Sequence, residues 1–224
     1  MQKTFELLFL GTGTSVGVPM IGCDCPVCSS ADPRDWRRRS AAYIRVGGKA
    51  LLVDTPPDLR EQALTFRVRD VDAILITHSH ADHLMGFDDI RRFNTINQAV
   101  MPIYALPEVL AEVRNIFHYV GETATAGLYR PLANFRGVNE PFQIGDARVT
   151  PVPVIHGASR VCGYRIDYEG RALGYVPDCA AMPEQAFELL AGVDVMVLDA
   201  LRDTPHPAHL TVADSLAALA RINA

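Results

Sequence analysis

The sequence predicts an α/β fold, an αββα sandwich in which sheets lie inside and helices outside. Short apolar runs typical of strands alternate with helical patterns along most of the chain. Residues 162–168 and 171–175 flank Glu169 and Gly170 as the two strands of a hairpin would. Antiparallel strand pairs with interspersed helices favour this layered arrangement. Because no repeat or long linker interrupts the pattern, we expect a single domain over residues 1–224.

The individual elements follow from local patterns. Strands are predicted where β-branched apolar runs end at turn residues, at 5–10, 42–46, 50–54, 73–77, 102–105, 147–155, 161–167, 172–176 and 193–199. Helices are predicted at 58–66, 87–93, 107–119, 183–190 and 211–222. Pro107 and Pro183 suit the first turn of a helix. Thr211, with Asp214 three residues later, indicates a capping box at the last helix.

The bulk composition is that of a soluble globular protein. The chain has 224 residues, 49% hydrophobic and 21% charged, which is enough for a sizeable core. Its net charge of −5 argues against a general nucleic-acid binder. The apolar runs are too short to span a bilayer, and Glu6 interrupts what would be a signal peptide. We therefore expect a cytoplasmic protein with no membrane partner, and a homodimer is compatible with these data.

The most informative motif places His78, His80, Asp82 and His83 within six residues. Imidazole is the commonest zinc ligand, and a carboxylate suits harder ions such as manganese. Four donors so close in sequence cannot all bind one ion without strain, so they indicate two neighbouring ions. The run at 73–77 precedes them, which places the donors on the loop at the carboxyl end of a strand.

Three further residues stand at the ends of predicted strands. His156 follows the apolar run 149–155, Asp178 follows 172–177, and Asp54 ends the run at 50–54. Taken singly, His156 and Asp178 are each more typical of a cap or a loop, and for Asp54, which lies just before Pro56 and Pro57, a turn residue is the alternative. Read together with the histidine cluster, His156 and Asp178 become candidate metal ligands.

These motifs also carry a family resemblance. The Gly11-Thr-Gly-Thr14 turn, Asp54, the His78–His83 motif, His156 and Asp178 follow the motif order of metallo-β-lactamase-fold hydrolases, which the chain resembles from about Phe5 onwards. The cysteine cluster described below and Ala208-His209 resemble more narrowly the phosphoribosyl 1,2-cyclic phosphate phosphodiesterases of the carbon–phosphorus lyase pathway and their relatives.

The resemblance implies a dinuclear site. One ion would be held by His78, His80 and His156, the other by Asp82 and His83, and Asp178 would bridge the two. Two such ions, zinc or manganese, would share a bridging hydroxide as the nucleophile. Asp54 would accept a hydrogen bond from a ligand imidazole and fix its tautomer.

Two residues near this site have open roles. His209 would protonate the departing alkoxide, and the alternative is that it caps the last helix or faces water. Arg91, on the helix after the histidine motif, is a candidate phosphate contact. The basic run Arg34, Arg37, Arg38 and Arg39 is more typical of a solvated loop than of a phosphate site.

Cys23, Cys25 and Cys28 form a C-x-C-x-x-C cluster. In a reducing compartment such a cluster favours a structural zinc ion, and a redox or regulatory thiol group is the alternative. A closed zinc site needs a fourth ligand from elsewhere.

The chain departs from the family pattern at its end. Relatives continue into a further strand with a Thr-His-x-x-His element, whose histidines complete the second metal and the cysteine site, whereas this chain stops at Asn223-Ala224. From this we expect a truncated product that lacks the last strand, with weak or absent metal at Asp82/His83 and at the cysteines.

The leading functional prediction is a metal-dependent phosphodiesterase that acts on small or cyclic phosphodiesters. A tRNA 3′-end nuclease would carry a projecting basic arm, and no such insert is evident, so a nucleic-acid partner is not expected. A lactone or thioester hydrolase remains an alternative, although the cysteine insert is not typical of those enzymes. A catalytically impaired form is the last alternative.

Overall fold

The computed structural model describes residues 4–224, and for Arg160 the backbone alone. Contacts divide the chain into two compact units, Met1–Gly137 and Val138–Ala224, called here the first and the second unit. Each unit contains one sheet, so the ligand-type residues can be followed sheet by sheet.

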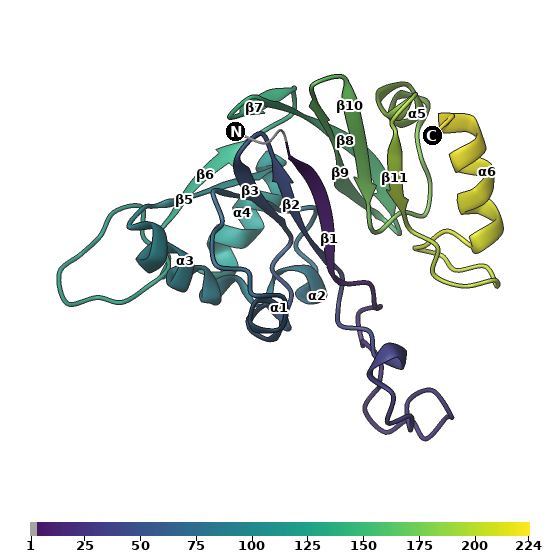
Figure 1. Cartoon of the computed structure of the whole chain (residues 1–224), viewed down its shortest axis with the longest axis horizontal. Helices are drawn as coiled ribbons and strands as arrows, with labels where there is room; N and C mark the ends of the chain where they lie inside the picture. Colours follow the sequence, from purple (N-terminus) through teal and green to yellow (C-terminus); the bar gives the residue numbers. More distant parts are fainter. Residues whose placement is uncertain (1–3) are drawn as a thin grey trace. The chain divides into compact units, whose positions relative to one another are not determined.

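The first unit contains a mixed sheet with the strand order β1-β2-β3-β4-β5-β6 (Figure 1). Its strands are β1 (Phe5–Gly11), β2 (Ala41–Val46), β3 (Lys49–Val53), β4 (Ala73–Leu75), β5 (Met101–Ala105) and β6 (Ala133–Gly137). The pairs from β1 to β3 are antiparallel and those from β3 to β6 are parallel. The inner strands consist of fully buried residues such as Leu52 and Ile74, as expected for parallel strands.

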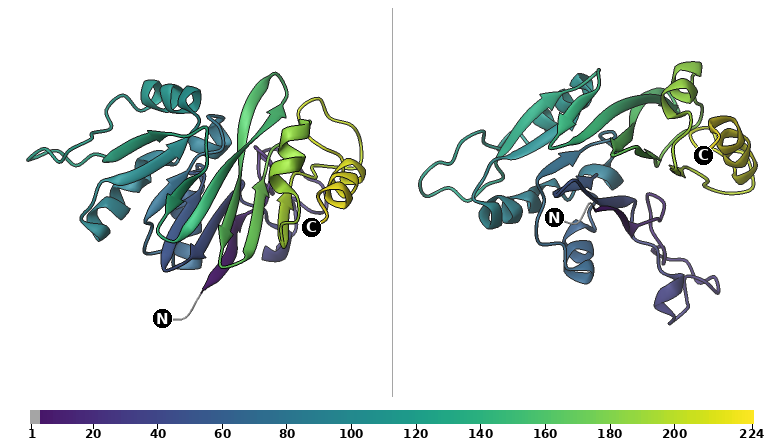
Figure 2. Two further views of the ribbon diagram at one scale, coloured as in Figure 1. Left: turned by 90° about the horizontal axis from the view of Figure 1, so that it is seen from above. Right: turned by 45° about the horizontal axis from the view of Figure 1, so that its top comes forward.

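Helices and two long connections complete this unit. The helical segments are η1 (Pro33–Asp35), α1 (Leu59–Phe66), α2 (Ala81–Leu84), η2 (Phe87–Asp89), α3 (Ile90–Asn97) and α4 (Pro107–Ile116). The connection from β1 to β2, which carries the cysteines and the basic run, and the connection from α4 to β6 both extend away from the sheet (Figure 2).

The second unit contains a sheet with the strand order β11-β10-β9-β8-β7. Its strands are β7 (Phe142–Ile144), β8 (Ala147–His156), β9 (Ser159–Tyr168), β10 (Arg171–Val176) and β11 (Val195–Leu198). All neighbours are antiparallel except the β10–β11 pair. The helices α5 (Glu184–Leu190) and α6 (Val212–Ile222) contribute Ala186, Leu190 and Ile222 to the core with Val152 and Val154.

Most predicted elements are present, and the two-sheet α/β class is confirmed. The hairpin turn is made by Glu169 and Gly170, both with positive φ, which is the geometry that matches the twist of paired strands. Thr211 and Asp214 form the predicted capping box at α6. Among residues 4–224, no helix is both long and apolar enough to cross a membrane.

Several boundaries differ from the predictions. Strands β6 and β7 were not predicted, because they have only five and three residues and neither is a continuous apolar run. The predicted helix at 87–93 is divided into η2 and α3. The helix predicted at 107–119 ends at Ile116, because Phe117 leaves the helical conformation at φ −107° and ψ 52°.

Candidate metal centre

In the first unit, the histidine motif follows β4 directly. His80 is the N-cap of the short helix α2, which places Asp82 in its first turn and His83 in its last. His78 and His83 are buried, whereas His80 is exposed. A strand end followed by a one-turn helix therefore presents all four donors within a single loop-and-helix segment.

Asp54 is the buried centre of this segment. It follows β3, has a φ of 64°, and is fully buried. Its Oδ1 accepts hydrogen bonds from the backbone N–H of Thr77 at 2.8 Å and from the Thr77 hydroxyl at 3.0 Å. Its Oδ2 lies 2.7 Å from Nδ1 of His83. Burial raises the pKa of Asp54, while the contacts with His83 and Thr77 oppose this shift.

These contacts determine the tautomers of two imidazoles. The carboxylate of Asp54 can only accept, so Nδ1 of His83 donates, and the Nε2 lone pair of His83 is left as the ligand atom. The Thr77 hydroxyl uses its one hydrogen on Asp54, so it accepts from Nδ1 of His78 at 2.9 Å. Nε2 of His78 is therefore also a lone-pair donor, the arrangement found in metal-binding histidines.

The three imidazoles of this segment are close together. Nε2 of His78 lies 3.0 Å from Nδ1 of His80. The ring centroid of His78 is 4.5 Å from that of His80 and 4.2 Å from that of His83. Oδ2 of Asp82 lies 3.5 Å from Nε2 of His83. Neutral imidazole nitrogens and a carboxylate oxygen at these spacings fit the donor set of zinc or manganese.

The second unit brings together a further donor group. His156 ends β8 and Asp178 follows β10, and Nε2 of His156 is 3.7 Å from Oδ2 of Asp178. Ligand-type atoms of His156, Asp178 and His209 all lie within 4.8 Å of one another. Nδ1 of His156 is 2.7 Å from the carbonyl oxygen of Ala208. That oxygen can only accept, so Nε2 of His156 again carries the lone pair.

His209 is held by a residue that the sequence analysis did not single out. Asp199, which is buried just beyond β11, accepts a hydrogen bond from Nδ1 of His209 at 2.7 Å. The same Oδ2 accepts from the backbone N–H of Cys179 at 2.9 Å, next to Asp178. Ser215 of α6 donates to the backbone carbonyl of Asp199. The only available signal was an acidic residue at the end of a predicted strand.

The three cysteines lie together in the connection between β1 and β2. Their sulfur atoms lie within 4.8 Å of one another, which suits a shared ion. The backbone N–H of Cys28 donates to Sγ of Cys25 at 3.4 Å. This bond, followed by the contact with the side chain of Cys23, lowers the pKa of Cys25 to about 7. A thiolate at this position is the form that binds zinc.

Arg91 lies in α3 and already has protein partners. Its guanidinium is 2.8 Å from Oδ2 of Asp88 and lies 5.5 Å from the ring centroid of Tyr129. Its contact with a substrate phosphate stays a prediction.

This chain has the features of a metal-binding hydrolase. It is a mixed α/β chain with two sheets, and clusters of histidine and aspartate lie at the ends of its strands. Residues 49–224 match the beta-lactamase superfamily domain, and the chain belongs to this superfamily, with the metallo-β-lactamase fold.

Relatives of this chain carry several different names. A solved diphosphatase from the PhnP family superposes with a TM-score of 0.86 and is 40% identical, with 97% of this chain and 83% of that chain covered. Coenzyme PQQ synthesis protein B of Methylobacterium nodulans is 30% identical over 87% of this chain and 72% of that protein. An octanoyltransferase of Porphyromonas gingivalis is 34% identical over 96% of this chain, which spans 43% of that protein.

Proposed function

We propose that this chain is a dinuclear metal-dependent phosphodiesterase that hydrolyses small or cyclic phosphodiesters. The observation that carries the proposal is the tautomer that His78, His83 and His156 have in common. In each, Nδ1 bonds to an oxygen atom and Nε2 is left as the ligand atom. The 40% identity to a diphosphatase supports phosphoryl chemistry in preference to other hydrolytic reactions.

The proposed ligand assignment uses both units. His78, His80 and His156 would hold one ion, Asp82 and His83 would hold the other, and Asp178 would be a ligand of both. Two divalent ions would supply a nucleophile at neutral pH and would stabilise the charge on the phosphoryl oxygens. Asp54 fixes the ring of His83, and the carbonyl of Ala208 fixes the ring of His156.

His209 is proposed as the general acid. Its Nδ1 is held by Asp199, so the ring is oriented and Nε2 is the atom that would give a proton to the leaving oxygen. The side chain of His209 is 20% exposed, which leaves it accessible to a substrate and to exchange of protons with water.

A panel of substrates tests the reaction class. We expect the chain, supplied with zinc or manganese, to hydrolyse bis(p-nitrophenyl) phosphate and to leave a lactone and an acyl thioester unchanged. Turnover of the lactone or thioester without the phosphodiester would refute the proposal.

Two variants in the loop that carries His209 test whether this residue is the general acid. Diphenyl phosphate has a poorer leaving group than bis(p-nitrophenyl) phosphate, so it needs the proton more. His209→Ala should lower kcat for diphenyl phosphate about a hundredfold and affect the nitrophenyl ester much less. His206→Ala is the matched control, because the rings of His206 and His209 are 5.0 Å apart. Equal losses on both esters would exclude acid catalysis by His209.

A second candidate is hydrolysis of an acyl ester or thioester. The relative named octanoyltransferase favours it, since that name describes acyl transfer. The thioester and lactone in the panel decide between the two candidates.

A further inference from the structure

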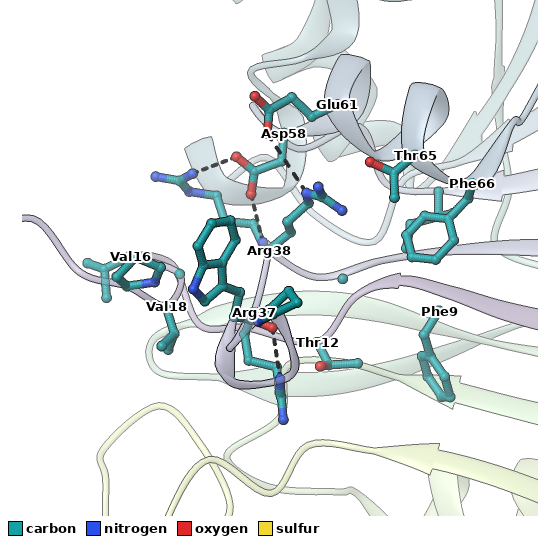
Figure 3. A pocket seen from close by; sticks show the side chains of 17 residues that line it. Phe9, Thr12, Val16, Val18, Arg37, Arg38, Asp58, Glu61, Thr65 and Phe66 are labelled. Atoms are coloured by element: carbon teal, nitrogen blue, oxygen red, sulfur yellow. Dashed lines mark hydrogen bonds and ion pairs between the residues drawn. The ribbon is translucent and has the colours of Figure 1, made fainter. Parts of the chain in front are cut away.

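A pocket in the first unit has a lining that the proposed hydrolysis does not use. It has a volume of about 610 Å³ and lies among the turn after β1, the segment 33–39 and α1 (Figure 3). Aromatic residues and consecutive arginines from these three segments line it. This volume lies within the range of small-molecule sites.

The walls of the pocket are held together by backbone contacts. The N–H of Gly13 donates to the carbonyl of Arg38 at 2.7 Å, and Val18 and Arg37 exchange two backbone hydrogen bonds of 2.8 Å. The side chain of Gln62 in α1 donates to the carbonyl of Arg39 at 2.8 Å. Since the walls are already ordered, ligand binding would not carry the entropy cost of ordering them.

Three large aromatic side chains are exposed in this pocket. Phe9 is 43% exposed, Phe66 is 38% exposed and Trp36 is 51% exposed. Phe9 comes from β1 and Phe66 from α1, and in Figure 3 both lie on the same side of Arg38. Exposed aromatic rings on two walls favour a ligand that contains a flat ring, because stacking would remove their exposed apolar area from water.

The charge of the lining favours an anion. Nη1 of Arg39 lies 2.8 Å from Oδ1 of Asp58, so the guanidinium of Arg39 already has an acidic partner. Arg38 lies 3.8 Å from Glu61, whose side chain is 71% exposed, so that pair is weak. Arg37 donates to two neutral backbone carbonyls. Three guanidinium groups and two carboxylates thus line the pocket, so positive charge is in excess. The paired N–H donors of a guanidinium group match the oxygen atoms of a phosphate.

We propose that this pocket binds a nucleotide. The base lies against Phe9 and Phe66, and the phosphate contacts Arg38. Each half of the ligand uses a different part of the lining, so a nucleoside or a sugar phosphate alone should bind much more weakly. The proposal concerns the first unit alone and does not depend on the metal-dependent reaction.

The chain offers a built-in probe, because Trp36 is its only tryptophan. AMP, adenosine and ribose 5-phosphate are each titrated into the metal-loaded protein, with indole fluorescence excited beyond the absorption of adenine. We expect a saturable change with AMP and at least about tenfold weaker binding of adenosine and of ribose 5-phosphate. Equal binding of adenosine and AMP, or no response to AMP, would overturn the proposal.

Two charge-matched variants separate this pocket from the metal centre. Arg38→Gln should weaken AMP binding at least about tenfold, because it removes the proposed phosphate contact. Arg45→Gln is the control, since Arg45 also has an exposed acidic partner, Asp70, but does not line the pocket. Both variants should hydrolyse bis(p-nitrophenyl) phosphate as the parent does. Unchanged AMP binding in Arg38→Gln, or an equal loss of AMP binding in both variants, would refute the proposal that this pocket binds the nucleotide.

Discussion

At the scale of the residue, Asp199 connects two parts of the candidate centre through one oxygen atom. Its Oδ2 accepts from Nδ1 of His209 and from the backbone N–H of Cys179, the neighbour of Asp178. Asp199 is buried, so water cannot replace these contacts cheaply. A single carboxylate therefore orients the proposed acid and fixes the backbone beside the proposed bridging ligand.

This double contact makes Asp199→Asn an informative substitution. Both contacts end on one oxygen atom, so the amide oxygen of asparagine can take its place and accept from Cys179 and from His209. The negative charge beside the proton-donating ring is lost, however, and a neutral acceptor orients and supports that ring less strongly than a carboxylate does. We expect kcat for diphenyl phosphate to fall about tenfold to a hundredfold, with a smaller loss for bis(p-nitrophenyl) phosphate. KM should change little, because Asp199 is not proposed to contact the substrate.

The control for that experiment is Asp167→Asn in β9. Asp167 also binds a neighbouring side chain, that of Arg165, but it is partly exposed. Its substitution should leave both esters unaffected. If Asp199→Asn lowered both rates equally and by the same factor as its loss of folded protein, the role of Asp199 would be structural alone.

The cysteines give a second prediction at this scale, one of pH dependence. The pKa of Cys25 is lowered from 9.0 to about 7, so its reactive thiolate is populated at lower pH than in an ordinary cysteine. Burial, and then the charge of Asp199, raise the pKa of Cys179 to about 12. In chelator-treated protein, alkylation of Cys25 by iodoacetamide should reach its plateau near pH 8, while Cys179 stays unlabelled in the native state.

Peptide mass spectrometry at a series of pH values measures both rates. A rate for Cys25 that still rose steeply above pH 9 would show that its thiolate is not stabilised. Added zinc should protect Cys25, because the thiolate is also the ligand form.

At the scale of the element, the end of β1 packs directly against the segment that leads into β2. A Cβ atom at Gly11 would lie 2.1 Å from the carbonyl oxygen of Arg39 and 2.6 Å from that of Arg38. Both are backbone atoms, which cannot move away as a side-chain end would. Only glycine allows the two chains to approach this closely.

Gly11→Ala should therefore lower the free energy of unfolding by about 3 kcal/mol, the upper part of the usual cost of overpacking. Gly22→Ala is the control from the same connection. Gly22 has a φ of +73°, but a Cβ atom there would meet no heavy atom within 4 Å, so only backbone strain, about 1 kcal/mol, applies. Urea unfolding followed by circular dichroism measures both, and equal costs would contradict the packing explanation.

The same scale shows where sequence patterns succeed and fail. The inner strands were predicted because a run such as that of β4 is apolar throughout. The sequence of β6, Ala-Asn-Phe-Arg-Gly, has no such signal, and this strand forms because its backbone pairs with β5. Pairing over a long sequence separation is absent from local periodicity. Candidate donors were visible because histidines clustered, whereas Asp199 acts through a contact with His209 that no spacing reveals.

At the scale of the whole molecule, the two units each have a sheet and a donor group of their own. The first unit provides His78, His80, Asp82 and His83. The second provides His156 and Asp178. Under the proposed assignment, one ion needs donors from both units, so removing a donor from either unit should release the same ion.

This requirement gives the last prediction. His80→Ala and His156→Ala should each lower the metal content by about one ion per chain, since a zinc or manganese site with one fewer imidazole binds far more weakly. His118→Ala is the control, because His118 is an exposed histidine outside the proposed ligand set. Metal content after gel filtration, measured by inductively coupled plasma mass spectrometry, reports each loss. The double variant decides the assignment: if the two histidines share an ion, it should lose no more metal than either single variant, whereas a loss of about two ions would mean that they serve separate sites.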